Sequence, residues 1–439
     1  MAAYDRSVLV LYGSETGNAQ DMAEELGRIS RKLNRRLDQL GATTFFDPFE
    51  ADEQFPDGLT PEKHWQDVRL ISFDIPRRDG DKLCCVPGDC LTIYPKNFPQ
   101  DVQKLITLMG WEEVAEKSLD LSLCESLPTN LHIDPKCTLR ELLLNNIDFT
   151  AIPRRSFLKN MSYFSTNPDH KERLLEFTMT EYLDEYFDYA TRSRRSILEV
   201  LEEFTSVKLP AERLFDIFPI IRGRDFSIAN GGEHQNHPTD KDKTRVELLV
   251  ALVKYKTVLR KPREGLCSRY LDNIPLDSIL TVTRKPVLSP IHGLQNARRP
   301  LVAIATGTGL APIRALIHER LTHPSPGPMY LFFGNRNREA DYFFQQELDA
   351  AVREGHLNVF LAFSRDQRNK IYVQDRLREE AKRIEEAILD NGIFCVCGGS
   401  TKMADAAKKA VFGPFSEGVN DTEERKKILA ALTWWQEIW

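Results

Sequence analysis

The 439-residue chain lacks three features that would place it in specialised protein classes. It contains no apolar run of about 18 residues or more, the length that a membrane-crossing helix needs, and its first residues hold no secretion signal. Its 65 acidic residues outnumber its 59 basic ones, which argues against binding to nucleic acid or to a membrane surface. Its eight cysteines do not have the spacing of zinc ligands. We therefore expect a cytoplasmic protein with no metal site and with reduced, mostly buried thiols.

A chain of this length exceeds what one hydrophobic core usually holds, so two or three domains are expected. Near its beginning, the apolar run at residues 7–12 is typical of a buried parallel strand that leads into a helix. Small and hydroxyl side chains in the following loop can, with backbone N–H groups, wrap a phosphate. An ordinary capped helix start is the alternative. The loop residues are Ser14, Glu15, Thr16, Gly17, Asn18 and Ala19.

The most informative stretch is the glycine-rich turn at residues 305–312, which follows an apolar run at residues 301–304. Glycines let backbone N–H groups approach a pyrophosphate, and a helix beginning near Pro312 would point its positive end there. By itself the pattern also fits a tight structural turn. Three further strands are expected at residues 329–333, 358–363 and 393–396, and their alternation with helices indicates a doubly wound sheet.

The middle of the chain has a different pattern. Residues 67–73 alternate as a half-buried strand does, and residues 87–95 read as a turn followed by another strand. Between about residues 100 and 207 the sequence becomes helical, with Thr138 and Ser196 as expected N-caps of two helices. Strands are expected to resume after this helical stretch.

Several short motifs in one order resemble the ferredoxin–NADP reductase-like half of the diflavin reductases. They are Arg224-Asp225-Phe226-Ser227, Gly265-Leu266-Cys267-Ser268, the turn at residues 305–312, Ser364-Arg365, Cys397-Gly398-Gly399 and the terminal Trp439. The resemblance implies an α/β and β-barrel multidomain fold. It places an incomplete flavodoxin-like (FMN) segment and linker at 1–60, an FAD-binding antiparallel barrel with a helical connecting subdomain at 61–295, and an NADPH-binding domain at 296–439.

The resemblance also assigns roles around FAD. Arg224 would pair with the pyrophosphate, Phe226 would flank the isoalloxazine ring, and the Ser227 hydroxyl would reach flavin N5, with Asp225 in the same motif. Gly265, Leu266, Cys267 and Ser268 would form a helix start that places N–H groups on the pyrophosphate. Arg192 is a further FAD contact or part of a solvated basic patch.

On the nucleotide side, the resemblance implies NADPH rather than NADH, because cations and hydroxyls suit the 2′-phosphate dianion. Cys397 would lie beside the nicotinamide C4 atom, or share with Cys395 the role of a core residue. Glu437 would lie near the nicotinamide carboxamide, and Trp439 would stack on the flavin until nicotinamide displaces it. The other expected nucleotide contacts are Thr308, Ser364, Arg365, Lys370, Ile371, Tyr372, Val373, Gln374 and Asp405.

The expected activity is therefore electron transfer from NADPH through FAD to a one-electron acceptor protein. The first sixty residues hold the FMN-phosphate loop without room for the loops that bind the flavin ring, so FMN binding is doubtful. Residues 265–270 and 333–337 resemble the branch of the family that serves cytosolic iron–sulfur protein assembly, which implies an anamorsin-like iron–sulfur partner. The alternative is a truncated isoform that binds the same partners without electron transfer.

Overall fold

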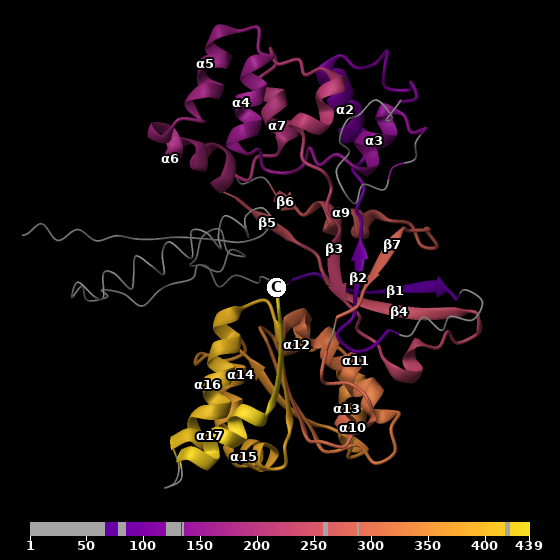
Figure 1. Cartoon of the computed structure of the whole chain (residues 1–439), viewed down its shortest axis with the longest axis vertical. Coiled ribbons are helices and arrows are strands. Elements are labelled where there is room, and N and C mark those ends of the chain that lie inside the picture. The colour runs from indigo at the N-terminus through magenta and orange to yellow at the C-terminus, as the bar shows by residue number, and fades with distance from the viewer. Residues whose placement is uncertain are drawn as a thin grey trace, which may run out of the picture. The chain divides into compact units, whose positions relative to one another are not determined.

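The computed structural model describes residues 66–77, 85–119, 133, 136–257, 262–287, 289–417 and 422–439 (Figure 1). The chain divides into two compact units, one of Met1–Lys63 with Tyr255–Pro262 and the other of His64–Lys254 with Arg263–Trp439. The helices and strands of the described residues belong to the second unit, apart from part of one short hairpin. The expected strand and phosphate loop near residues 7–19 lie outside the described residues.

A five-stranded parallel sheet forms the last third of the chain, in the order β10-β9-β8-β11-β12. The four strands that the sequence predicts are confirmed, and a fifth is added by the final residues. Apolar runs of four to six residues form these strands because a sheet covered on both faces buries every side chain. The strands are β8 (Leu301–Thr306), β9 (Met329–Asn335), β10 (Asn358–Phe363), β11 (Ile393–Gly398) and β12 (Thr433–Ile438).

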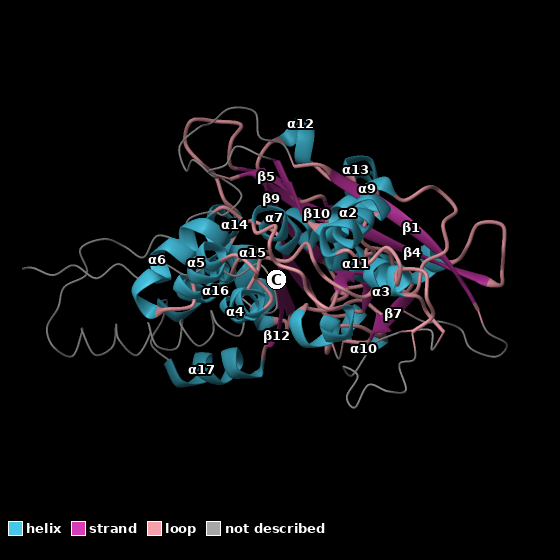
Figure 2. Cartoon of the chain, turned by 90° about the horizontal axis from the view of Figure 1, so that it is seen from above, coloured by secondary structure: helices cyan, strands magenta, loops and turns pink. Residues whose placement is uncertain are grey.

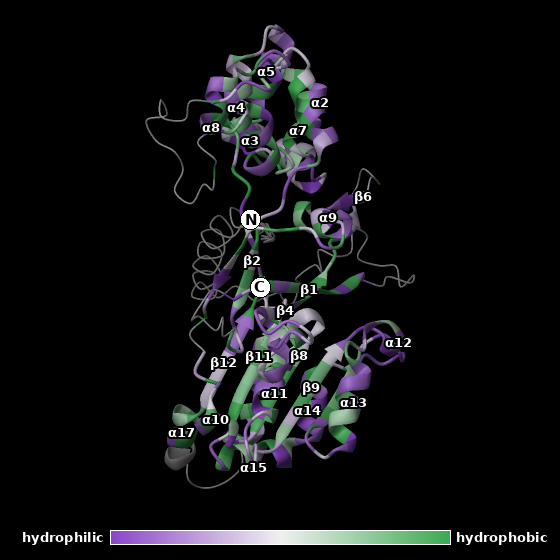
Figure 3. Cartoon of the chain, turned by 90° about the vertical axis from the view of Figure 1, so that its right-hand side faces the viewer, coloured by the Kyte–Doolittle hydropathy of each residue, from purple (hydrophilic) through white to green (hydrophobic). Residues whose placement is uncertain are grey.

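Helices cover both faces of this sheet, and alternate residues of β8 show the division. Leu301, Ala303 and Ala305 pack in one apolar cluster, whereas Val302 and Ile304 pack in the opposite one. Figure 3 shows the apolar colouring of the central strands between their helices. The first cluster includes α11 (Leu310–Leu321) and α13 (Gln345–Arg353), and the second α14 (Val373–Glu379), α15 (Ala381–Leu389) and α16 (Thr401–Glu417). The doubly wound arrangement is therefore confirmed.

Antiparallel strands form the part of the chain that the sequence analysis expects to bind FAD, and among the described residues they fall into separate sheets. β1 (Val68–Pro76) pairs with β4 (Lys243–Ala251), and β2 (Cys90–Ile93) lies between β3 (Arg224–Ser227) and β7 (Val282–Lys285). An isolated bridge between Ile228 and Leu248 links the region of β3 to β4. β5 (Lys254–Lys256) and β6 (Pro262–Glu264) form a further hairpin, followed by α9 (Leu266–Asn273).

The helical insertion between β2 and β3 is confirmed, and its helix starts follow local capping rules. Thr138 and Ser196 each accept the backbone N–H three residues later, while Glu141 and Glu199 return the bond to the cap backbone. The insertion contains α2 (Pro99–Met109), α3 (Leu139–Asn145), α4 (Arg155–Tyr163), α5 (Pro168–Glu176), α6 (Leu183–Tyr186), a π-helix (Phe187–Arg192), α7 (Ile197–Glu203) and α8 (Leu214–Ile217).

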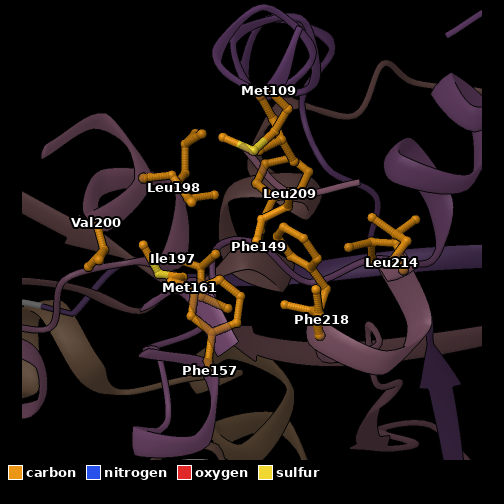
Figure 4. Packing of buried hydrophobic residues seen from close by; sticks show 14 of the residues in the cluster. Met109, Phe149, Phe157, Met161, Ile197, Leu198, Val200, Leu209, Leu214 and Phe218 are labelled. Carbon is orange, nitrogen blue, oxygen red and sulfur yellow. The ribbon is translucent and has the colours of Figure 1, made fainter. Parts of the chain in front are cut away.

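These helices enclose a core of their own. Figure 4 shows its packing, in which the rings of Phe157 and Phe218 meet edge to face with centroids 5.4 Å apart. Figure 2 shows the helices and the strands in separate colours. The other described helices are α10 (Leu294–Ala297), α12 (Arg338–Asp341), α17 (Thr422–Ala431) and the 3-10 turns Thr180–Tyr182, Ala211–Arg213, Gly232–Gln235 and Gly307–Gly309. Within the described ranges, no helix has both the length and the apolar character to cross a bilayer.

Candidate active site

The glycine-rich turn after β8 lies against the end of β11. A Cβ atom at Gly309 would stand 2.2 Å from the Cys397 carbonyl oxygen, so only glycine permits this approach. α11 begins one residue later at Leu310, close to the expected Pro312. The carboxyl ends of β8 and β11 therefore meet in front of a helix N-terminus, which is where doubly wound sheets bind dinucleotides.

Ser227 and Glu437 join the antiparallel region to the parallel sheet. Ser227 ends β3, and its hydroxyl donates a hydrogen bond of 2.5 Å to Oε1 of Glu437 on β12. Cys90, opposite Ser227 in the β2–β3 register, places its Sγ atom 3.8 Å from the same Oε1. Ser227 and Glu437, which the sequence analysis places separately at flavin N5 and near the nicotinamide carboxamide, are thus hydrogen-bonded to each other in the fold.

Burial dominates the electrostatics of this cluster. It raises the pKa of Glu437 above its usual range, and the hydrogen bonds from Ser227 and Cys90 oppose that rise. Burial, helped by the nearby Glu437, also raises the pKa of the Cys90 thiol to about 12. Among the described residues, the buried Glu437 Oε2 atom has no hydrogen-bond partner. One carboxyl oxygen of Glu437 is therefore held by the protein, and the other is a buried acceptor without a hydrogen-bond donor among the described residues.

Cys397 lies next to Glu437 in the β11–β12 register, and Cys395 packs in the same cluster on the same face of β11. Both are fully buried, and burial raises the pKa of Cys397 well above its usual value and that of Cys395 to about 12. Neither thiol ionises near neutral pH. The structure thus places Cys397 beside the predicted catalytic carboxyl, in a position that also satisfies the core interpretation.

The two predicted pyrophosphate elements lie on β3 and at the start of α9. Burial raises the pKa of Cys267 in the first turn of α9 to about 12, and the charge of the Arg224 guanidinium acts to lower it. Gly265 caps α9 with no side-chain hydrogen bond. A guanidinium and an uncapped helix start are each suited to binding an anion. Leu266 begins this helix, while the Ser268 hydroxyl accepts a 3.0 Å bond from the Val253 N–H.

Asp225 and Phe226 have structural partners. Asp225 forms an ion pair of 2.5 Å with Lys285 on β7 and accepts a 2.6 Å bond from Thr92 on β2, so it ties the three strands together. Phe226 is half-buried against the apolar core of the antiparallel region. Arg192 is exposed and ion-paired with Asp188 within the insertion, an arrangement that favours the solvated-patch interpretation.

The turns after β9 and β10 lie side by side in the region predicted for the 2′-phosphate. Ser364 donates its N–H to the Asn335 carbonyl at 2.9 Å, and Arg365 donates its N–H to the Arg336 carbonyl at the same distance. Asp366 accepts the Arg338 N–H at 3.0 Å, so its carboxylate is engaged by the neighbouring turn. The Asp366 contact with a backbone N–H is therefore compatible with the predicted role of the cations in these two turns.

The remaining predicted nucleotide contacts surround the same sheet edge. Thr308 lies in the 3-10 turn after β8, Lys370 is exposed, and Asp405 is exposed on α16. The Tyr372 N–H donates 3.0 Å to Asp375 at the start of α14. In this segment Ile371 and Gln374 are half-buried, Tyr372 is exposed, and Val373 is buried in the core.

The final residue lies over the carboxyl end of β11. The Trp439 N–H donates to the Gly398 carbonyl at 3.3 Å, and 55% of the residue is exposed. Trp435, four residues earlier, is buried on β12. Trp439 is therefore held by its backbone while its indole ring is largely free of the core.

A buried ion-pair cluster fastens α11 to the antiparallel region. Arg314 on α11 pairs with Glu247 on β4 at 2.7 Å and with Glu347 on α13 at 2.8 Å, and it donates to the Ala229 carbonyl at 2.9 Å. Its guanidinium also lies 4.1 Å from the centre of the Phe344 ring. Only 7% of the Arg314 side chain is exposed. This cluster fixes how the Ser227 strand and the nucleotide sheet meet.

His318, one helical turn after Arg314, is neutral in this cluster. Its Nδ1 accepts the Gly231 N–H at 3.4 Å, and its Nε2 lies 2.8 Å from Glu347 Oε1, which fits a proton on Nε2. The His234 ring stacks on it with centroids 3.7 Å apart. Burial lowers the pKa of His318, whereas hydrogen bonds from His318 and Arg314 overcome burial and hold that of Glu347 at about 2.

Cys90 and Arg314 also contribute to the site, although neither was predicted from the sequence. Cys90 follows the turn at residues 87–89, but nothing in the sequence shows that it faces Ser227. Arg314 lies in an apolar helix, where a buried cation predicts a buried partner, but the sequence does not show which residue that partner is. Both depend on contacts between residues far apart in the chain.

Two family models match the chain. The family described as "FAD binding domain" matches residues 48–270, and that described as "Oxidoreductase NAD-binding domain" matches residues 303–409. No model of an FMN domain matches. The two matches fall on the antiparallel region with its helical insertion and on the parallel sheet.

Curated relatives resemble the chain along most of its length. A Gibberella zeae protein named "NADPH-dependent diflavin oxidoreductase 1" is 65% identical over 603 alignment positions, with all of both chains covered. The alignment is longer than the 439 residues of this chain, so some segments of that relative are aligned with gaps in this chain. Relatives of the same name from Aspergillus fumigatus and Danio rerio are 44% and 34% identical over 82% and 88% of this chain. The chain spans only 58% and 65% of their lengths.

Proposed function

Because the chain belongs to the NADPH-dependent diflavin oxidoreductase family, we propose that it carries electrons from NADPH through FAD to a one-electron acceptor protein. Its FAD-binding and NAD-binding regions make it an oxidoreductase that uses FAD and NADPH. The observation that carries the proposal is the 2.5 Å hydrogen bond between Ser227 of the first region and Glu437 of the second.

The described residues fit both cofactors. Arg224 and the uncapped start of α9 offer donors for the FAD pyrophosphate, and the Gly309 turn before α11 offers a close backbone approach for NADPH. Oε2 of Glu437, which has no donor among the described residues, supplies a buried acceptor where the two regions meet. FAD, when bound, accepts a hydride and can release electrons singly, which links a two-electron donor to a one-electron acceptor.

The chain's own groups then have separable tasks. Ser227 holds Glu437 Oε1, so the carboxyl cannot turn, and Oε2 is presented to the nicotinamide carboxamide. An ionised Glu437 stabilises the positive charge that the nicotinamide gains as the hydride leaves. Arg365 and Lys370 supply cations for the 2′-phosphate. Trp439, held through its backbone, can move its exposed ring without disturbing the core.

We further infer that the acceptor is an anamorsin-like iron–sulfur protein of cytosolic iron–sulfur assembly. The support is the resemblance of residues 265–270 and 333–337 to that branch, together with relatives that share one printed name. No observation favours the alternative of a non-productive binder.

Flavin analysis tests the first step. The purified chain, heated to release its flavin, should yield about one FAD per chain and little FMN, because a phosphate loop alone forgoes most of a pocket's apolar burial. One FMN per chain in the released flavin would contradict the expectation that this chain binds FMN poorly. Anaerobic NADPH should bleach the bound flavin, and a coloured protein that NADPH leaves unchanged would overturn the proposed activity.

The acceptor is tested separately. Ferricyanide serves as a general one-electron acceptor, and an anamorsin-like iron–sulfur protein as the specific one, with loss of the cluster's visible absorbance as the signal. Reduction of both supports the proposal. Reduction of ferricyanide alone would overturn the acceptor for this chain while leaving the NADPH–FAD step intact.

A further inference from the structure

Cys90 stands at the start of β2, directly between two polar residues of its neighbouring strands. It faces Ser227 on β3 and Lys285 on β7 in the register of the sheet. Cross-strand neighbours have Cβ atoms about 4.5–5.5 Å apart, so the pairing alone fixes which way its side chain can reach. Only 7% of the residue is exposed.

The Cys90 thiol has three polar atoms within reach. Its Sγ lies 3.8 Å from Glu437 Oε1, 3.8 Å from the Gly88 carbonyl oxygen and 4.0 Å from the Ser227 hydroxyl. Ser227 donates its own proton to Glu437 Oε1. Two side-chain donors from neighbouring strands thus converge on one carboxyl oxygen, and within the described part of the chain the buried Oε2 remains without a partner.

We propose that Cys90 is a positioning residue for hydride transfer: its neutral thiol, with Ser227, holds Glu437 Oε1 so that Oε2 is directed at the nicotinamide. The inference rests on the proposed function and adds a residue to it. Cys90 acts through Glu437 and does not itself touch the reacting atoms. Its replacement should therefore alter the behaviour of Glu437 more than the binding of NADPH.

A nucleophilic or redox role for Cys90 does not fit its surroundings. Burial and the nearby Glu437 raise the pKa of the thiol to about 12, and the thiolate is the reactive form of cysteine. The thiol is uncharged at neutral pH, and an uncharged thiol is a hydrogen-bond donor. The role that its chemistry leaves is that of a donor to the carboxyl.

The charged and titratable groups around Glu437 come from several elements. Cys90 on β2 and Cys397 on β11 are both neutral thiols, and the ion pair of Asp225 with Lys285 lies near Cys90. Burial raises the pKa of Glu437, and the Cys90 thiol is one of two donors that oppose the rise. Removing that donor should raise the pKa of Glu437 further, while a hydroxyl in its place should restore part of the effect.

The test uses the FAD-loaded chain with Cys90→Ala, Cys90→Ser and the control Cys137→Ala, which removes a buried thiol from the helical insertion. The rate of FAD reduction by NADPH is followed against pH. Cys90→Ala should lose about threefold to tenfold in rate near the acid limb, as one modest hydrogen bond is lost, with KM nearly unchanged. The acid limb should move to higher pH, Cys90→Ser should recover part of the shift, and the control should behave as wild type.

Infrared titration of the Glu437 carboxyl, without NADPH, supplies a readout that needs no turnover. The carboxyl of folded, FAD-bound Cys90→Ala should ionise at higher pH than that of wild type, and coincident midpoints would overturn the proposal. If wild type itself fails to reduce FAD, the proposed function fails while the infrared comparison still decides the role of Cys90.

A second variant keeps the proposal falsifiable should Cys90→Ala not fold. In Glu437→Ala the thiol loses the carboxyl acceptor and retains the Gly88 carbonyl. The S–H stretching band of Cys90 should therefore shift relative to wild type. An unchanged band would show that the thiol does not bond to Glu437, and the proposal would be wrong.

Discussion

Replacing Arg314 with methionine should be among the most destabilising changes at the junction of the two regions. Methionine keeps the apolar stem over Phe344 and removes the guanidinium from Glu247, Glu347 and the Ala229 carbonyl. Two carboxylates with exposed fractions of only 17% and 35% would then lose their shared cation. Breaking a buried ion pair by removing one partner costs about 3–5 kcal/mol.

The matched control is Arg213→Met, which breaks the ion pair with Asp216 on the exposed surface of the insertion. Its partners are 66% and 62% exposed, so the expected loss is about 0.2–1 kcal/mol. Urea unfolding is followed by tryptophan fluorescence, to which Trp434, Trp435 and Trp439 of the nucleotide domain contribute together with Trp65 and Trp111 outside it. The difference between the two variants is the quantity to measure.

A compensating variant separates lost attraction from stranded charge. Arg314→Met combined with Glu247→Leu and Glu347→Leu removes all three charges, so much of the lost stability should return. If Arg314→Met costs less than about 1 kcal/mol, or no more than Arg213→Met, the cluster does not hold the two regions together. Equal losses in the single and triple variants would show that packing, not charge, sets the cost.

The same cluster predicts a pH dependence of stability. Folding lowers the pKa of His318, so stability should fall as the pH drops below about 6.5. The folded-state pKa of Glu347 is about 2, so a further loss of stability should occur between about pH 4.5 and 2. In thermal unfolding measured across pH, His318→Gln should remove the first loss. Arg365→Ala should weaken NADPH by about tenfold to a hundredfold and leave NADH nearly unchanged in equilibrium titrations, since it removes a charge-assisted contact to the 2′-phosphate; equal losses would place Arg365 outside that site. Deleting Trp439 should tighten NADPH binding and raise NADH use without lowering the melting temperature, because 55% of the residue is exposed; a lower melting temperature with unchanged coenzyme preference would refute the stacking role.

Local sequence determined much of the fold. The apolar runs at residues 301–304, 329–333, 358–363 and 393–396 predict strands because their composition and length suit a doubly covered sheet, and each is confirmed. Thr138 and Ser196 predict helix starts because their hydroxyls satisfy N–H groups only three residues away. Such interactions depend on near neighbours in the chain, so the sequence displays them directly.

The final strand, β12, could not be predicted from the local sequence pattern. Residues 433–438 contain three aromatic or branched apolar side chains among polar ones. From the sequence, only Glu437 among them was expected to act at a cofactor, and no strand was predicted there. In the fold they form β12, which pairs with β11 and puts Glu437 opposite Cys397. A strand at the edge of a sheet takes its stability from its neighbour, and that neighbour lies outside any short window of sequence.

Only the tertiary structure assembled the active-site cluster. The motifs identified Ser227 and Glu437 as separate candidates, but their hydrogen bond joins residues 210 positions apart, and Cys90 and Glu437 are separated by 347. Strand register decides that Cys90 faces Ser227, and a shift of one residue would turn Cys90 to the other face of the sheet. The residue types therefore predicted which chemical groups the site contains. The pairing of distant strands and the buried charge cluster on α11 decided which of their atoms are in contact.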